Sequence, residues 1–511
     1  MKNDTRINVI INIVRTLVLT LLSFITFPWV CRYLHESAVG MYTWANTFVA
    51  YFLILAKIGI PNLAVRECVK VRDNKEKLSN KVQGFFLLQL IATVLSFGLM
   101  TAVVFSVPAL RDGSVSPLIF ILSINFIVGA FSFEWVFIAL EKQFYMSVRS
   151  IVALTLCAIL IIAFVSNPDD VYIYALIAVS VTIITTVANV FYVRKFISFK
   201  KTMPYSFKEY VKPLFVLCSL SLILSLYNQT DTFILGFIDK TKGEVGSYSV
   251  GIKGIDIIIG IITALSTVFI PRAAYYYEKE DKRFFNNLTK YSINICLFIV
   301  LPAIVTMACL SQQICSLISG NFDYSSSASA EFVSAPMILI VLCSMMLTYS
   351  LGDIIYGQIL LPMKKEKYYL IAIGVGTALN VGLSIFLGGY LPTVVKGLSP
   401  SVGVAIGTAV TDLLIIIFLI SLTWKWVKGA IFNLNTLKLF IANVIIVGVT
   451  LGLYFPLGML WSKIGLSNTI SAMLQIVSIV FVDAIIYLGF LALTKENLVY
   501  SFIRKDRKTA E

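Results

Sequence analysis

A few ionisable side chains lie inside long apolar stretches of this sequence, and their chemistry stands out. Arg15 and Lys57 occur in two such stretches, and Lys253 and Asp256 lie three residues apart in another. A charge at the centre of a membrane helix costs about 2.5 to 3.5 kcal/mol on insertion scales, so it persists where it has a partner or faces a watery cavity. These residues are therefore the first candidates for binding or coupling.

The two cations near the N-terminus belong to polar stripes with helical spacing. Asn12, Arg15 and Thr26 lie close to one helix face, and Asn46 and Lys57 follow a similar stripe in the next segment. Arg15 is about two turns inside its segment, which favours a cavity-lining role over reaching the membrane surface. Lys57 is near the end of its segment, so a side chain extended to the headgroups is favoured, with substrate binding as the alternative.

Carboxylates form a second group of candidates. Asp231 lies near the outer end of a span, where a proton or sodium ion could remove its desolvation cost; the alternative is a charge partner for Lys253. Lys253 and Asp256 could simply neutralise one another, since residues three apart are neighbours on a helix. For Glu134 a structural role is slightly favoured over ion coupling, and Asp353 is a similar case.

Enzyme and metal chemistry find little support. His35 is the only histidine and has no accompanying ligands. Asp169-Asp170 follows Asn167-Pro168, which is an ordinary turn sequence. The eight cysteines are scattered without paired metal-type spacing and are expected to be packing residues. We therefore predict no catalytic residue, no metal site and no cofactor.

The composition predicts an all-α integral membrane protein. Of the 511 residues 58% are hydrophobic and only 13% are charged, which leaves too little polar surface for soluble domains. Apolar stretches of the length that crosses a bilayer recur along most of the chain. About fourteen spans are predicted, at 9–30, 40–60, 83–107, 116–140, 149–166, 171–193, 212–238, 247–271, 290–310, 333–361, 369–390, 402–424, 437–459 and 468–493.

The net charge of +14 is a topology signal rather than evidence for a nucleic-acid partner. With the N-terminus inside, most of the 41 Lys and Arg residues fall in cytoplasmic segments, as the positive-inside rule requires. This predicts a multi-pass protein with both termini in the cytoplasm and no nucleic-acid partner.

An internal repeat divides the chain. Val39-Gly40-Met41-Tyr42 opens one predicted span and Val245-Gly246-Ser247-Tyr248 opens another, and both spans end in Ile-Pro, at Ile60-Pro61 and Ile270-Pro271. Both copies have the same topology, so two pseudo-symmetric six-helix lobes with a cleft between them are predicted. The predicted division is an N-terminal lobe at 1–200, a C-terminal lobe at 205–430, and two further helices with a tail at 431–511.

The order of several short motifs resembles the Wzx-type polysaccharide flippases, in the multidrug/oligosaccharidyl-lipid/polysaccharide exporter superfamily. The segment from Ser132 to Lys142 resembles the aromatic end of that family's helix 4. Asp231, Ile234-Leu235-Gly236 and the second repeat motif resemble its helix 7 to helix 8 signature. Several further segments of this sequence resemble the family's region of helices 10 to 12. They are Gly357-Gln358-Ile359-Leu360-Leu361-Pro362, Lys364-Lys365-Glu366-Lys367, Asn380 and Gly403-Val404-Ala405-Ile406-Gly407-Thr408.

The resemblance implies a MATE-like fold and a flippase that works by alternating access. Its substrate would be an undecaprenyl-pyrophosphate-linked oligosaccharide moved to the outer leaflet of the bacterial cytoplasmic membrane, for capsule, O-antigen or exopolysaccharide assembly. Implied partners are membrane lipids and the polysaccharide polymerase and chain-length machinery, with a proton or sodium gradient as energy source.

The cations suit this substrate, because Arg binds phosphate with two hydrogen bonds and Lys adds a point charge. We expect Arg15, Lys57, Lys253, Asn12 and Asn46 to bind substrate, with Asp231, Asp256, Glu134 and Asp353 as coupling or charge-pair residues. A lipid II flippase and a cation-coupled multidrug exporter of the same superfamily are the alternatives; the cationic stripes disfavour the exporter. A membrane polymerase or glycosyltransferase is less expected, because the loops are short.

Overall fold

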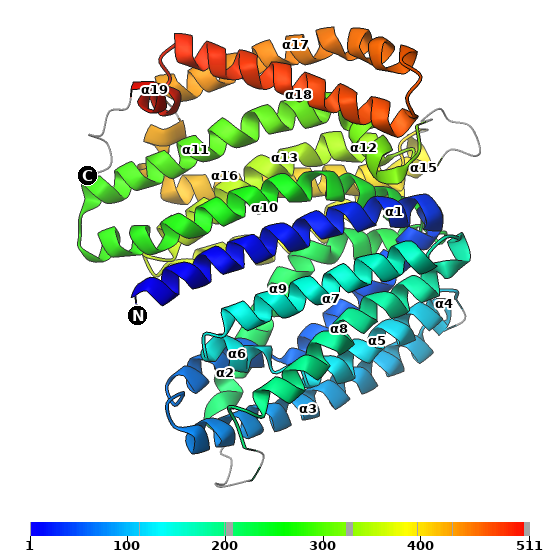
Figure 1. The fold of residues 1–511 in the computed structure, drawn as a ribbon, viewed down its shortest axis with the longest axis vertical. Helices are drawn as coiled ribbons and strands as arrows, with labels where there is room; N and C mark the ends of the chain where they lie inside the picture. Colours follow the sequence, from blue (N-terminus) through cyan, green and yellow to red (C-terminus); the bar gives the residue numbers. More distant parts are fainter. Residues whose placement is uncertain are drawn as a thin grey trace. The chain divides into compact units, whose positions relative to one another are not determined.

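The computed structural model describes residues 2–111, 113–198, 200, 208–322, 331–395, 397–431 and 433–504. Within these ranges the chain is helical and contains no strand. It forms two compact units, Met1–Gly246 and Ser247–Glu511 (Figure 1). The all-α membrane fold predicted from composition is confirmed. The finer division at 1–200, 205–430 and 431–511 stays a prediction from the repeat.

Unit 1 is built from long helices linked by short turns. In chain order its elements are α1 (Lys2–Lys57), α2 (Ile60–Val69), α3 (Lys75–Ser106), α4 (Pro108–Arg111), α5 (Ser116–Ala130), α6 (Glu134–Ala139), α7 (Gln143–Phe164), the 3₁₀ turn η1 (Pro168–Asp170), α8 (Val171–Val193), α9 (Lys208–Ile238) and the start of α10 (Gly243–Glu278).

Unit 2 contains the rest of α10 and the helices that follow it. They are α11 (Lys282–Cys309), α12 (Ser311–Ser319), α13 (Ala335–Ile354), the π-helix η2 (Ile355–Leu360), α14 (Glu366–Ser384), the π-helix η3 (Ile385–Tyr390), α15 (Leu391–Val394), α16 (Pro400–Ile431), α17 (Leu434–Lys463), α18 (Asn468–Leu493) and α19 (Asn497–Arg504).

The spans agree with about fourteen crossings. Twelve helical segments in the described part are long and apolar enough to cross a membrane, and one of them, Val18–Val69, covers the predicted span 40–60 and more than half of the predicted span 9–30. They meet at His35, whose left-handed φ of 64° bends α1 where an outer loop was expected. The shorter apolar helix Ser116–Ala130 continues across a break at Phe133 (φ 48°) into α6 and forms another predicted span.

Aromatic packing joins α9 to α1 within unit 1. The Trp44 indole N–H donates to the carbonyl oxygen of Phe233 at 3.0 Å, and the rings of Trp44 and Phe237 meet edge to face at 5.2 Å. A Cβ atom at Gly236 would lie 1.7 Å from the Trp44 ring, so only glycine permits this approach. The seventh predicted span therefore packs against the N-terminal helices (Figure 1).

The glycines of the repeated motif lie side by side. A Cβ atom at Gly40 would lie 1.7 Å from the carbonyl oxygen of Lys242 and 2.9 Å from the amide nitrogen of Gly246. One at Gly246 would lie 2.2 Å from the carbonyl oxygen of Glu36. Because glycine has no side chain, the two backbones approach closely, which gives the repeated glycine a packing reason.

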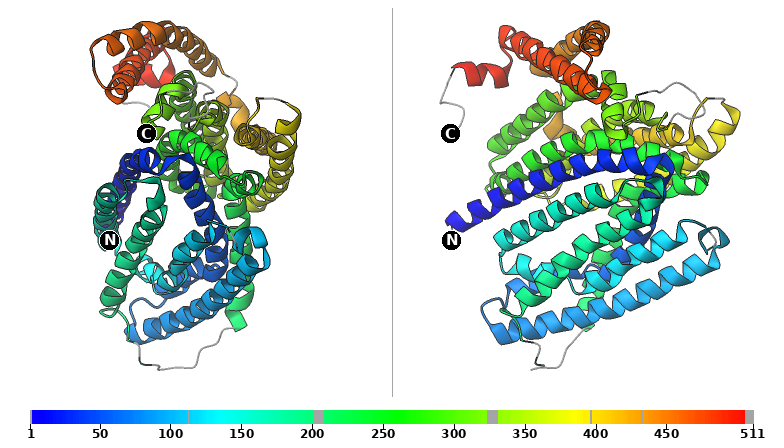
Figure 2. Two further views of the ribbon diagram at one scale, coloured as in Figure 1. Left: turned by 90° about the vertical axis from the view of Figure 1, so that its right-hand side faces the viewer. Right: turned by 45° about the vertical axis from the view of Figure 1, so that its right-hand side comes forward.

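Unit 2 packs α11, α13, α14 and α16 around one another, with α17 and α18 as an adjacent antiparallel pair (Figures 1 and 2). Helix α10 approaches α13 through small residues: a Cβ atom at Gly251 would lie 2.6 Å from the Ile338 side chain, and one at Gly254 would lie 2.9 Å from that of Leu339. Close approach at small residues is how membrane helices gain packing contacts.

Candidate functional site

Lys253 and Asp256 form an ion pair on α10, with 3.7 Å between Nζ and Oδ2. The lysine side chain is 26% exposed and the aspartate side chain 48%. The pairing expected from their spacing is therefore present. Both partners lie on one helix and keep access to their surroundings, so this pair can open without any helix separating.

The other candidate cations are on α1. Arg15 is half-buried, as a cavity-lining residue or a partly covered cation would be. Lys57 is exposed and ends the helix, which agrees with a side chain extended to the surface. Asn46 is exposed, whereas the side chain of Asn12 lies outside the described residues. Their substrate-binding roles stay predictions.

Asp231 is 6% exposed on α9, next to the buried Thr230. Tyr51 of α1 lies close to both residues and packs edge to face on Phe233 at 5.1 Å. The carboxylate thus sits beside the aromatic contact between α1 and α9. A buried carboxylate with hydroxyl neighbours has the chemistry to hold a proton or a small cation.

Glu134 is paired with Arg149, a residue that the sequence analysis did not single out. Glu134 Oε1 and Arg149 Nη2 lie 2.6 Å apart, and the arginine side chain is 6% exposed against 48% for the glutamate. Arg149 Nε and Nη1 have no hydrogen-bond partner in the described part of the chain. This pair links α6 to α7.

The burial of Arg149 depends on where its helix begins. A span predicted from 149 places the arginine at a membrane edge, but α7 begins at Gln143. Six residues of helix correspond to about 9 Å, so Arg149 lies nearly two turns inside the helix. Only contacts with neighbouring helices explain its burial.

Asp353 belongs to a polar group in unit 2. It is half-buried just before the π-helix η2, and its Oδ2 has no hydrogen-bond partner among the described residues. Gln358, within η2, is fully buried and both of its amide atoms are likewise unpartnered there. Tyr369 of α14 stacks on Tyr356 at 4.4 Å and is within electrostatic reach of Asp353 and of Asp412 on α16.

This group has the composition of an ion-coupling site. Two carboxylates, Asp353 of α13 and Asp412 of α16, lie within electrostatic reach of Tyr369, and the buried amide of Gln358 follows Asp353 by five residues in the chain. Short π-helical segments occur frequently at functional sites. Asp353, for which the sequence slightly favoured a structural role, therefore has a neighbouring carboxylate that suits a shared cation or proton. Gln358 belongs to the motif from Gly357 to Pro362, but no role was predicted for it.

Two further polar residues were not considered from the sequence. Asp483 of α18 is 3% exposed and accepts a 2.7 Å hydrogen bond from Thr450 of α17, with Thr306 of α11 at 3.5 Å. It ties the α17–α18 pair to α11. Lys242, between α9 and α10, lies 5.0 Å from the Trp44 ring centre and donates to the Asp239 carbonyl at 3.1 Å. Burial lowers the pKa of Lys242, and Asp239 partly offsets this.

Comparison with known proteins decides the family. A family model described as "Polysaccharide biosynthesis protein" matches residues 6–276, which is more than half of the chain. The chain belongs to the polysaccharide biosynthesis protein family. None of the curated protein sequences compared with the chain matches it.

Solved structures with the same fold are known. The lipid II flippase MurJ, in an inward closed conformation, has a TM-score of 0.72 at 16% identity, with 95% of this chain and 99% of MurJ covered. An inward-facing multidrug resistance MATE transporter has a TM-score of 0.59 at 17% sequence identity, with 80% of this chain and 96% of that transporter covered. A transporter of the multidrug/oligosaccharidyl-lipid/polysaccharide superfamily from Pyrococcus furiosus has a TM-score of 0.52 at 16% sequence identity. This match covers 81% of this chain and 93% of that transporter. The predicted MATE-like fold is confirmed, and the family match agrees with the predicted role in polysaccharide assembly only at the level of the family.

Proposed function

We propose that this protein is a flippase that moves an undecaprenyl-pyrophosphate-linked oligosaccharide from the inner to the outer leaflet of the bacterial cytoplasmic membrane. The observation that carries the proposal is the polysaccharide biosynthesis family match over 6–276 in a chain with the fold of MurJ, itself named a lipid II flippase. The protein acts by alternating access and performs no bond chemistry. Both termini lie in the cytoplasm.

The embedded cations support an anionic lipid as cargo. A pyrophosphate entering a region of low dielectric needs cations that are desolvated in part and can exchange partners. Arg15 is half-buried, and Lys253 forms a 3.7 Å ion pair with Asp256 on its own helix. In the proposed mechanism Lys253 leaves Asp256 and pairs with the phosphate. Lys57, Asn12 and Asn46 complete the proposed set.

The proposed energy source is a proton or sodium gradient acting at carboxylates. Asp353, with the unpartnered amide of Gln358 and the nearby Asp412, supplies one site in unit 2. Asp231 supplies another in unit 1. An ion that binds one conformation more tightly than the other shifts the equilibrium between them by that difference in affinity.

Lipid II is the second candidate cargo, because the fold match to MurJ extends over 95% of the chain. Both lipids carry a pyrophosphate and a polyprenyl tail, so the cations serve either. They differ in the headgroup, which polar residues common throughout the chain would contact. A polysaccharide polymerase and chain-length proteins are the proposed partners for the first cargo.

The test is Arg15→Ala in a strain that depends on this gene, with the lipids extracted and their sugars identified. Loss of flipping with normal membrane insertion and accumulation of an inner-leaflet lipid-linked oligosaccharide supports the proposal. Arg283→Ala, an exposed arginine at the start of α11, is the matched control and should leave flipping intact. Full activity of Arg15→Ala would refute the assigned role, and accumulation of a peptidoglycan precursor would favour lipid II.

A further inference from the structure

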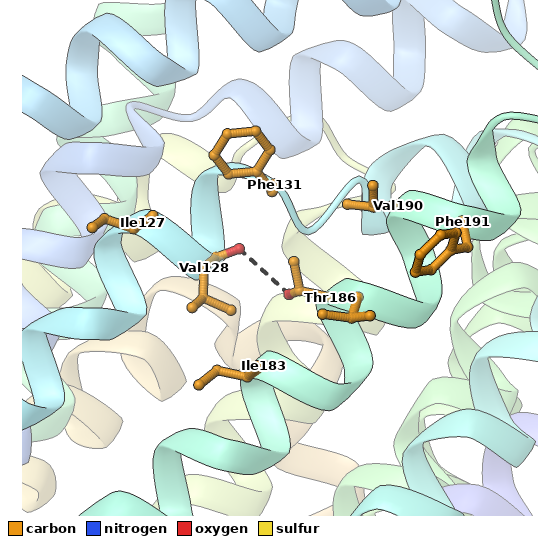
Figure 3. Close-up of a pocket in the computed structure, with 8 residues that line it drawn as sticks. Ile127, Val128, Phe131, Ile183, Thr186, Val190 and Phe191 are labelled. Carbon is orange, nitrogen blue, oxygen red and sulfur yellow. Dashed lines mark hydrogen bonds between the residues drawn. The ribbon is translucent and has the colours of Figure 1, made fainter.

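An apolar groove of about 290 Å³ lies between α5 and α8 of unit 1 (Figure 3). Ile127 of α5 and Phe131, which directly follows α5, line one side, and Phe191 of α8 lines the other. Val187 of α8 also belongs to the lining. Thr186 is the one polar side chain in the lining, and its hydroxyl donates to the Val128 carbonyl at 3.4 Å. With that hydroxyl occupied, the groove offers contacts to hydrocarbon only.

The groove opens outward from the unit. Ile127 is 66% exposed, Phe191 64% and Val187 48%. Both helices belong to the apolar, membrane-crossing part of the chain, so the surroundings of the groove are lipid chains rather than water. Its occupant is therefore an acyl or prenyl chain, and the groups at its ends decide which lipid fits.

One cation, Arg194, lies at the end of the groove where α8 stops, and two further cations lie over nearby rings that are not part of the lining. The Arg194 guanidinium lies 5.5 Å from the ring centre of Phe191, which lines the groove. Lys195 Nζ lies 5.3 Å from the ring centre of Tyr192, and Lys142 Nζ lies 5.4 Å from that of Phe196. Rings beneath the cations hold them in place at this end. Arg194 and Lys195 remain exposed, so each can bind an anion.

We propose that this groove binds one anionic glycerophospholipid of the inner leaflet, with an acyl chain between α5 and α8 and the phosphate at Arg194 and Lys195. The positive-inside distribution assigns this end of α8 to the cytoplasm, where the anionic headgroup lies. Basic residues beside an apolar groove are the chemistry that separates anionic from zwitterionic lipids. This site is independent of the cargo and of the flipping mechanism.

The test is native mass spectrometry of the purified full-length protein in detergent with added dioleoyl phosphatidylglycerol or phosphatidylethanolamine. We expect retention of one phosphatidylglycerol in preference to phosphatidylethanolamine. Arg194→Ala should weaken that retention about five-fold, from the roughly 1 kcal/mol of one basic residue near an anionic headgroup. Arg66→Ala, an exposed arginine of α2, is the matched control and should retain the lipid as the wild type does.

A second pair of variants tests the groove itself. Val187→Trp fills the lining and should abolish retention, whereas Val152→Trp, on an exposed position of α7 (61%), should not. Equal retention of the two phospholipids, or wild-type retention by Val187→Trp, would overturn the proposal. Displacement of phosphatidylglycerol by an equal concentration of undecaprenyl phosphate would also overturn it and assign the groove to the carrier lipid.

Discussion

Two ion pairs in this protein differ in how deeply they are buried and in whether their partners share one helix. Glu134 and Arg149 come from different helices, lie 2.6 Å apart and bury the arginine almost completely. Lys253 and Asp256 come from one helix, lie 3.7 Å apart and are both accessible. Burying a charge makes its partner indispensable, whereas an accessible pair contributes little stability. The first pair is therefore structural, and an exchange of partners during transport is the role we propose for the second.

The largest expected effect is at Glu134. Glu134→Ala leaves the Arg149 guanidinium buried and unpaired, which should lower the free energy of unfolding by about 3 kcal/mol. Denaturation of the purified protein, followed by tryptophan fluorescence, measures the change. If Glu134→Ala lowered the free energy of unfolding by less than about 0.5 kcal/mol, the pair of Glu134 and Arg149 would contribute no more than the accessible pair of Lys253 and Asp256. The two pairs would then not differ in their contribution to stability.

Next in size is the effect of Lys253 on transport. Lys253→Ala should reduce flipping at least about ten-fold, because one charge-assisted contact to phosphate is worth about 1.5 kcal/mol or more. Lys253→Arg should recover part of the activity, since it restores the charge. The readout is lipid-linked oligosaccharide reaching the outer leaflet per unit of inserted protein. Unchanged flipping in Lys253→Ala would contradict the exchange of partners.

Removing the other member of the first pair should cost less. Arg149→Met keeps the aliphatic volume and leaves Glu134, which is 48% exposed and can be hydrated, so the expected loss is about 1 kcal/mol. The same denaturation experiment compares it with Glu134→Ala. If Arg149→Met were the more damaging of the two, the arginine would be contributing by packing and not by requiring its partner.

The smallest effect is expected at Asp256. Asp256→Asn should change the free energy of unfolding by less than about 0.5 kcal/mol, the usual value of an accessible pair three residues apart on a helix. The denaturation midpoint with unchanged slope is the measurement. A loss comparable to that of Glu134→Ala would show that Asp256 stabilises more than its own helix.

Long apolar segments made the membrane fold predictable, because the length of a span and the exclusion of charge are local properties. The repeated motif was equally local, and the structure adds that its glycines, Gly40 and Gly246, approach one another closely. One break was foreseen and another was not. His35 bends α1 in the gap between the predicted spans 9–30 and 40–60, whereas Phe133 interrupts the predicted span 116–140 without a turn residue that would signal it.

By itself, the sequence determined that this chain spans a membrane many times, that its motif glycines recur, and that Lys253 and Asp256 are neighbours, since each depends on spacing within one segment. Only the tertiary structure decided that Glu134 pairs with Arg149, that Asp353 shares its surroundings with Gln358 and Asp412, and that Asp483 holds α17 and α18 to α11. These partners are distant in the chain, and no local periodicity encodes which helix faces will meet.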